Sequence, residues 1–221
     1  MGLIQTRVIL NAVNLDMFRP APRDDGLLEE LGIDPGAVVI AFLGNLHDRK
    51  RPLDIVRSSP AVLSRCPLVV YVVIGEGALR EEMVRTSRTL GVEGRFRFVD
   101  WRSYEQVPRH INMADIVVLP SFGEGLARVY LETQACGRVL IASDIAPARE
   151  VIEDGTTGLL FPVGDVERLA ARCIQAAQDR DLRARIGHAA RARVQRHHDM
   201  AAAVSQYLAA FDALLGRDRF S

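Results

Sequence analysis

The sequence predicts an α/β protein in which a Rossmann-like parallel sheet is covered by helices on both faces. Residues 37–44 (AVVIAFLG) and 68–75 (LVVYVVIG) are apolar almost throughout, which is typical of strands buried on both faces. The segments between such runs have the length and pattern of helices, so the strands are expected to run parallel through right-handed crossovers. After residue 165 only helical stretches are expected, which adds a helical carboxyl-terminal tail.

The other elements follow the same alternation. Further strands are expected at residues 95–100, 115–121, 138–143 and 156–162. Helices are expected at residues 52–65, 78–91, 103–114, 145–152 and directly after residue 121. Pro60 and Pro108 are expected to break or restart their helices, because proline lacks a backbone N–H. Residues 1–221 are interpreted as one domain, with an amino-terminal segment at about 1–20 and a last helix at about 198–215.

Composition excludes several classes of function. The chain has 221 residues and a formal net charge of zero, so no field of one sign favours nucleic acid over the whole surface. No apolar run reaches the roughly 18 residues of a membrane span, and the first residues lack the apolar core of a signal peptide. The three cysteines are scattered, which indicates core thiols of a reducing compartment and a cytoplasmic location. No metal-ligand spacing is present, and no metal or cofactor is expected.

Ligands of open parallel sheets bind at the carboxyl ends of the strands, so the loops there are the candidate sites. In GEGALRE, Gly75 and Gly77 follow a strand, but Arg80 takes the place of the third glycine of a dinucleotide fingerprint. We therefore favour a tight strand-to-helix turn over a cofactor loop. A dehydrogenase is correspondingly disfavoured.

The loop GNLHDRKRP after the first strand is rich in charge. It contains Lys50, the only lysine among the 28 basic residues of the chain. One interpretation is a solvated loop with a lysine placed by chance. The other is an anion cradle in which a compact ammonium contacts a phosphate.

The segment SFGEGLARVYLETQACG contains two carboxylates with seven residues between them. Glu124 lies in a glycine-rich loop, where it either caps the next helix or contacts a ligand. The free N–H groups of that helix, from about Gly125 to Arg128, form a ready anion site. Glu132 lies deeper in a mostly apolar helix and needs a partner, either a ligand diol or an arginine.

In this order and at these spacings, the motifs resemble the glycosyl transferases group 1 family, whose members are retaining enzymes of the GT-B fold. The resemblance covers the chain almost end to end and points to the carboxyl-terminal, nucleotide-sugar-binding half. It is carried by NAVNLDMFRP, FLGNLHDRKRP, VVIGEGALREEM, the stretch from FRFVDWRSY through the two glutamates to QACG, and GTTGLLFPVGDVERLA.

The resemblance implies roles for particular residues. Lys50 matches the lysine on the donor diphosphate, and Glu124 matches the glutamate beside the donor sugar, so both are candidate catalytic residues. Glu132 matches the glutamate that binds the nucleotide ribose. The remaining donor-binding candidates are Gly44 and Asn45 after the first strand, Arg102 beside the base, and Gly125, Leu126, Ala127 and Arg128 over the diphosphate and sugar. The implied chemistry is metal-independent and retaining, with the leaving phosphate helping to deprotonate the acceptor on the same face.

The sequence also departs from the family pattern. Asn45 replaces an arginine, Ala127 replaces a glycine, and Arg128 replaces an apolar residue; Arg49, Arg51 or Arg128 is a candidate for the missing cation. Family enzymes have a second, amino-terminal domain that binds the acceptor, so this chain is expected to bind a donor without turnover alone. The alternative is a non-catalytic nucleotide-sugar-binding module. The apolar last helix is expected to pack on that absent domain or to drive self-association.

Overall fold

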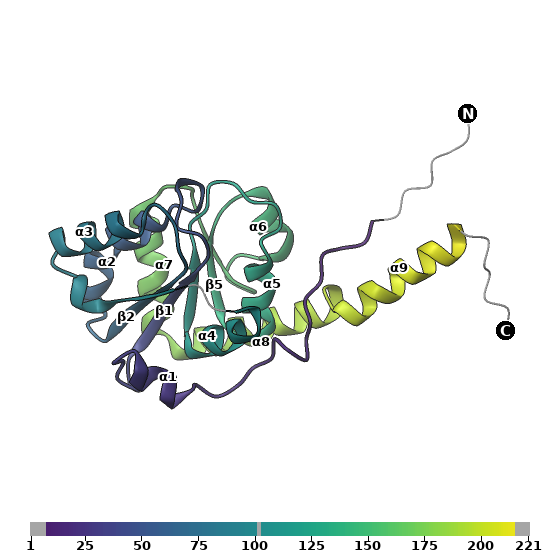
Figure 1. The fold of residues 1–221 in the computed structure, drawn as a ribbon, viewed down its shortest axis with the longest axis horizontal. Helices are drawn as coiled ribbons and strands as arrows, with labels where there is room; N and C mark the ends of the chain where they lie inside the picture. The colour runs from purple at the N-terminus through teal and green to yellow at the C-terminus, as the bar shows by residue number, and fades with distance from the viewer. Residues whose placement is uncertain (1–7, 101–102, 215–221) are drawn as a thin grey trace.

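The computed structural model describes residues 8–100 and 103–214, and its centre is a six-stranded sheet in the order β3-β2-β1-β4-β5-β6 (Figure 1). All neighbouring strands run parallel, which confirms the predicted sheet. The strands are β1 (Val38–Leu43), β2 (Val69–Ile74), β3 (Phe96–Val99), β4 (Ile116–Leu119), β5 (Val139–Ser143) and β6 (Leu159–Phe161).

Helices lie on both sides of the sheet (Figure 1), as predicted. Helix α2 packs against α3 and α7, whereas α5 packs against α4, α6 and α8. The helices are α1 (Asp25–Glu30), α2 (Pro52–Arg65), α3 (Arg80–Thr89), α4 (Val107–Met113), α5 (Arg128–Ala135), α6 (Ala146–Val151), α7 (Val166–Gln178), α8 (Arg180–His197) and α9 (Met200–Leu214). Short 3-10 turns are η1 (Asp48–Lys50), η2 (Glu93–Arg95) and η3 (Tyr104–Gln106).

The core lies where the apolar runs predicted it. Every residue of β2 and β4 is buried, because helices cover both faces of these central strands. Strands β1 and β2 pair in register from Val38 opposite Val69 to Leu43 opposite Ile74. Both strands therefore end at the same edge of the sheet, which places the loops that follow them side by side.

Pro60 does not break its helix, contrary to the sequence-based expectation. Helix α2 runs without interruption through Pro60 to Arg65. A proline at this position leaves the carbonyl of Val56 without its usual N–H donor. The Ser59 hydroxyl donates to that carbonyl at 2.8 Å, so the lost backbone hydrogen bond is replaced by a side-chain one.

Pro108 was also expected to break or restart its helix, and the segment is divided there. The 3-10 turn η3 ends at Gln106, and α4 begins at Val107 with Pro108 in its first turn, where the missing N–H has no partner to lose. The short helix α1 was not predicted. Its signal was present in the sequence, since Asp24 caps it by accepting a hydrogen bond from the Leu27 N–H at 2.9 Å.

The glycines of GEGALRE allow the loop after β2 to lie directly against the loop after β1. Gly75 and Gly77 have φ of 146° and 149°. A Cβ atom would lie 2.0 Å from the Gly44 carbonyl oxygen at position 75, and 2.4 Å from that of Leu46 at position 77. Because these glycines accommodate protein backbone, the interpretation as a tight structural turn is confirmed.

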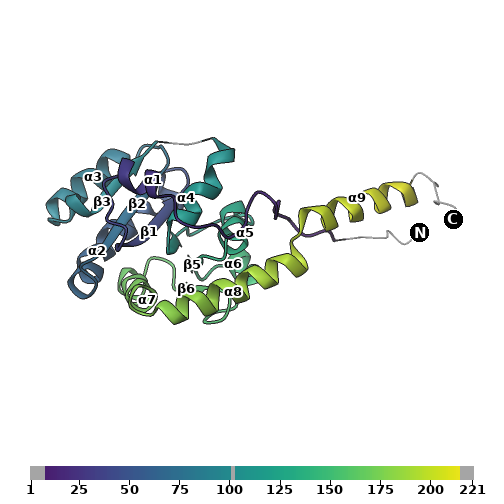
Figure 2. The same cartoon turned by 90° about the horizontal axis from the view of Figure 1, so that it is seen from below.

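The carboxyl-terminal helix extends away from the sheet, beside the amino-terminal segment (Figures 1 and 2). The segment is tied to the junction of α8 and α9 by two backbone hydrogen bonds, from Val13 N–H to the His198 carbonyl and from Met200 N–H to the Val13 carbonyl. Most of α9 is exposed. No helix within residues 8–100 and 103–214 is long and apolar enough to cross a membrane.

Candidate functional site

The strand order reverses between β1 and β4, which lie side by side at the centre of the sheet. From β1 the chain proceeds outward to β2, and from β4 it proceeds in the opposite direction to β5. The loops after β1 and β4 therefore diverge around a crevice at the carboxyl edge, where open α/β sheets bind ligands. The Phe122 N–H donates to the Arg49 carbonyl at 3.0 Å and joins these two loops.

Lys50 and Glu124 meet across this crevice. The Lys50 Nζ lies 2.5 Å from the Glu124 Oε1. The Lys50 side chain is 18% exposed and the Glu124 side chain 7% exposed. A charge pair this sheltered is attracted more strongly than a surface pair. The ligand-free site thus contains a balanced pair in which the ammonium retains donors for a further anion.

The loop after Glu124 leads directly into α5. Ala127 precedes the helix, and no side chain caps the first turn. Glu124 consequently does not serve as the cap, one of the two roles considered for it from the sequence. The first-turn N–H groups of Arg128 and Val129 have no helical partners, and together with the helix dipole they favour an anion beside them.

Glu132 lies one turn further along α5 and is 3% exposed. Burial raises the pKa of its carboxyl group, while a hydrogen bond with Tyr104 and the charge of Arg128 oppose that rise. In turn, burial and the neighbouring Glu132 carboxylate raise the pKa of Tyr104 to about 12. The buried Glu132 therefore has Tyr104 from η3 as its partner, and Arg128 of α5 adds a favourable positive charge.

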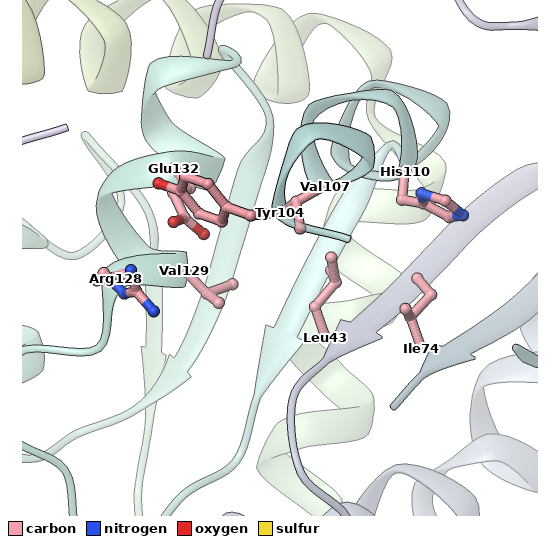
Figure 3. Close-up of a pocket in the computed structure, with 8 residues that line it drawn as sticks. All are labelled: Leu43, Ile74, Tyr104, Val107, His110, Arg128, Val129 and Glu132. Atoms are coloured by element: carbon pink, nitrogen blue, oxygen red, sulfur yellow. The ribbon is translucent and has the colours of Figure 1, made fainter. Parts of the chain in front are cut away.

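These residues line a pocket beside the ends of β1 and β2 (Figure 3). The pocket spans about 480 Å³, including the part open to solvent. Its floor is apolar, and Glu132, Tyr104 and Arg128 supply polar groups on one side (Figure 3). The lining residues are Leu43, Ile74, Tyr104, Val107, His110, Arg128, Val129 and Glu132. A flat apolar group with neighbouring hydroxyls matches such a lining.

The structure brings together most of the residues predicted for the site. Lys50 and Glu124 form one pair, and Arg128 and Glu132 belong to the pocket. Gly44 ends β1 with φ of 151°, and the segment from Gly125 to Ala127 connects the pair to α5. Asn45 is exposed in the loop after β1 and does not line the pocket. Arg102 lies outside the described residues.

The candidates for an additional phosphate cation differ in their surroundings. Arg51 contacts the buried Asp54 carboxylate at 2.6 and 3.3 Å, so its guanidinium is already engaged. Arg49 is exposed, and its side chain passes beside Gly123 at the mouth of the crevice. Arg128 lies over the Tyr104 ring, 5.4 Å from its centre. Arg49 and Arg128 are therefore the exposed candidates of the three, whereas Arg51 is held by Asp54.

Sequence reasoning missed Tyr104. The residue lies in DWRSY, one of the strand-end loops considered as candidate sites, but it was not singled out as a binding residue. Two hydroxyls beside the site were also missed. Within the described residues, the Ser121 and Tyr130 hydroxyls are buried without a hydrogen-bond partner. Burial, and to a smaller extent the Glu124 charge, raise the pKa of Tyr130.

The parallel sheet and the reversal of its strand order define a Rossmann-like domain. The profile of the glycosyl transferases group 1 family matches residues 25–193, and the chain belongs to this family. It is similar to D-inositol 3-phosphate glycosyltransferases of Rhodococcus erythropolis, with 32% identity over 72% of this chain and 38% of the relative, and of Actinosynnema mirum, with 35% identity over 69% and 39%. The chain thus spans less than half the length of these relatives.

Solved structures show the same fold. The Anabaena protein HepE, crystallised with UDP and glucose, has a TM-score of 0.84 and 23% identity, covering 94% of this chain and 57% of that one. The carboxyl-terminal domain of the group 1 protein LpcC from Francisella tularensis has a TM-score of 0.77 and 23% identity, covering 85% and 99%. The chain therefore has the Rossmann-like architecture of GT-B glycosyltransferases and corresponds to a carboxyl-terminal half.

Proposed function

We propose that this chain is the donor-binding half of a retaining, metal-independent glycosyltransferase that uses a nucleoside-diphosphate sugar. The observation that carries the proposal is the arrangement around the first turn of α5. The Lys50–Glu124 pair lies at the strand-order reversal, and the buried Glu132 lies in the same helix beside an apolar pocket. This arrangement offers separate places for a sugar, a diphosphate and a nucleoside.

Each group has a role in the proposed reaction. The nucleoside occupies the pocket, and Glu132 accepts hydrogen bonds from its ribose hydroxyls. The Lys50 ammonium and the free N–H groups of Arg128 and Val129 stabilise the charge that develops on the leaving diphosphate. Glu124 lies beside the donor sugar. The departing phosphate assists deprotonation of the acceptor on the same sugar face, which preserves the anomeric configuration.

Calorimetric titration with UDP-, GDP- and ADP-sugars tests the binding step. We expect one nucleotide class to bind at one site, with the same affinity in EDTA and in Mg²⁺, because the ammonium and the helix terminus supply the positive charge. Loss of binding in EDTA would contradict metal independence. Absence of binding for all nucleotides would contradict donor binding itself. A non-catalytic binding module, the alternative, predicts binding without transfer even after an acceptor domain is supplied.

We further propose that α9 packs on an amino-terminal acceptor domain. Its exposed apolar residues recur at one helical face, as they do in helices that pack against a partner. They are Met200, Val204, Tyr207, Leu208 and Phe211, which are 41–58% exposed.

A cytoplasmic location is proposed as well, supported by Cys66, Cys136 and Cys173, all of which are free thiols.

The isolated chain is expected to self-associate through this face of α9. Light scattering over a concentration series should show a growing dimer fraction in the wild type. Leu208→Glu should abolish the dimer, because burying a carboxylate between apolar faces costs free energy. Gln206→Glu adds the same charge to the opposite side of α9 and should leave the dimer unchanged. A wild-type monomer at all concentrations would show that the face does not self-associate.

A further inference from the structure

Glu132 presents a physical problem for the proposed binding mode. A carboxylate that accepts two ribose hydroxyls must be ionised, yet this one is almost fully buried and disfavours charge for that reason. Besides Arg128 on its own helix, the titratable side chains near it are Tyr104 from η3, Cys136 directly after α5 and His110 from α4, which lines the same pocket. Of these, Tyr104 lies beside Glu132 (Figure 3), and its hydrogen bond opposes the rise that burial causes in the pKa of the carboxyl group.

Tyr104 is held in a defined place. Its ring lies 5.5 Å from the Phe18 ring at 56°, which is a tilted aromatic contact. The Arg128 guanidinium lies over the ring, 5.4 Å from its centre. Figure 3 shows the tyrosine side chain beside Glu132, with Arg128 on the same side of the pocket. Tyr104 is 40% exposed, so part of its ring faces solvent at the pocket.

We propose that Tyr104 is a positioning residue that holds the Glu132 carboxylate in place of a ligand hydroxyl and releases it to the ribose when the nucleotide binds. The handover to the ribose rests on the proposed function, whereas the hold of Tyr104 on Glu132 does not. Arg128 belongs to the same unit, because it attracts the Glu132 carboxylate and packs on the Tyr104 ring.

The hold of Tyr104 on the Glu132 carboxylate can be tested without ligand. In Tyr104→Phe the ring and its contacts remain, and only the hydroxyl is lost. Side-chain carboxyl ¹³C resonances of Glu132 followed through a pH titration should show a higher pKa in the variant than in the wild type, because the ionised form loses a donor. Tyr207→Phe removes a hydroxyl from the exposed face of α9 and should leave the Glu132 titration unchanged. An unchanged Glu132 titration in Tyr104→Phe would overturn the proposal.

The handover is tested by nucleoside-diphosphate affinity across pH. At a pH where the carboxyl resonances show Glu132 ionised in both proteins, Tyr104→Phe should bind at least as tightly as the wild type, since no hydroxyl competes for the carboxylate. At a lower pH, where the resonances show more protonated Glu132 in the variant than in the wild type, the affinity of the variant relative to the wild type should fall about tenfold. The ratio of the two affinities cancels the pH effects that are common to both proteins.

The outcomes separate this proposal from the function on which it rests. A constant affinity ratio at every pH would mean that Tyr104 contributes only packing, and it would overturn the handover while leaving donor binding intact. Failure of the wild type to bind any nucleoside diphosphate would overturn both donor binding and the handover. In that case the ligand-free Glu132 titration still decides whether Tyr104 holds the carboxylate.

Discussion

Lys50→Arg is expected to fold like the wild type and to lose about tenfold or more in affinity for a nucleoside diphosphate, close to the loss in Lys50→Ala. The Lys50 ammonium has three donors in different directions, so it can hold Glu124 and a phosphate oxygen together. A guanidinium instead directs two parallel N–H groups at one carboxylate. The 2.5 Å contact with Glu124 would become a two-point clamp that competes with the phosphate. Calorimetry at fixed ionic strength measures the loss.

Two further variants show whether the loss in Lys50→Arg is specific to this position and to its contact with Glu124. Arg49→Lys exchanges the same two residue types at the neighbouring, exposed position, and its effect on affinity should be small. Glu124→Gln frees the ammonium, so affinity for a nucleoside diphosphate without sugar should stay equal or rise. Wild-type affinity in Lys50→Arg would refute the special role of lysine and leave its uniqueness in the sequence to chance.

Gly75→Ala is expected to reduce the free energy of unfolding by about 3 kcal/mol or more. The residue has φ of 146°, a conformation in which alanine is strained. The new methyl would lie 2.0 Å from the Gly44 carbonyl oxygen, so the loops after β1 and β2 must separate. Urea denaturation followed by circular dichroism provides the measurement.

Gly94→Ala is the matched control for this substitution. A Cβ atom at Gly94 meets no other atom within 4 Å, and its backbone lies outside the left-handed region. Its stability should change by less than about 0.5 kcal/mol or rise slightly, because alanine restricts the unfolded chain. Equal stability of the two variants would show that the close approach of the loops is not needed for the fold.

The strands could be predicted because a strand that is buried on both faces has a continuous apolar sequence. The same runs located the carboxyl-edge loops, and Lys50 and Glu124 were found there as separate residues. Helix continuity through Pro60 could not be predicted from proline alone, since it depends on a hydroxyl from Ser59 that replaces the missing donor. The local apolar pattern was thus enough to predict the strands. Whether helix α2 continues through Pro60 could not be predicted from that pattern.

The partners within the site could not be predicted for a different reason. Lys50 and Glu124 lie 74 residues apart in the chain, and their contact exists only because β1 and β4 are adjacent in the sheet. Tyr104 reaches Glu132 from η3, after a third strand. The sequence did indicate that a buried glutamate needs a partner. Which side chain supplies it depends on loop conformation, which no periodic pattern encodes.

The unusual lysine content has a consequence for chemistry on the protein. Lys50 carries the only side-chain amine in the 221-residue sequence, and it is 18% exposed at the crevice. Apart from the chain's own amino terminus, an acylating reagent selective for amines has one attachment point. A modified peptide that contains residue 50 therefore reports on a single atom, the Lys50 Nζ. Slower acylation in the presence of a candidate ligand would reveal occupancy of this crevice without any introduced label.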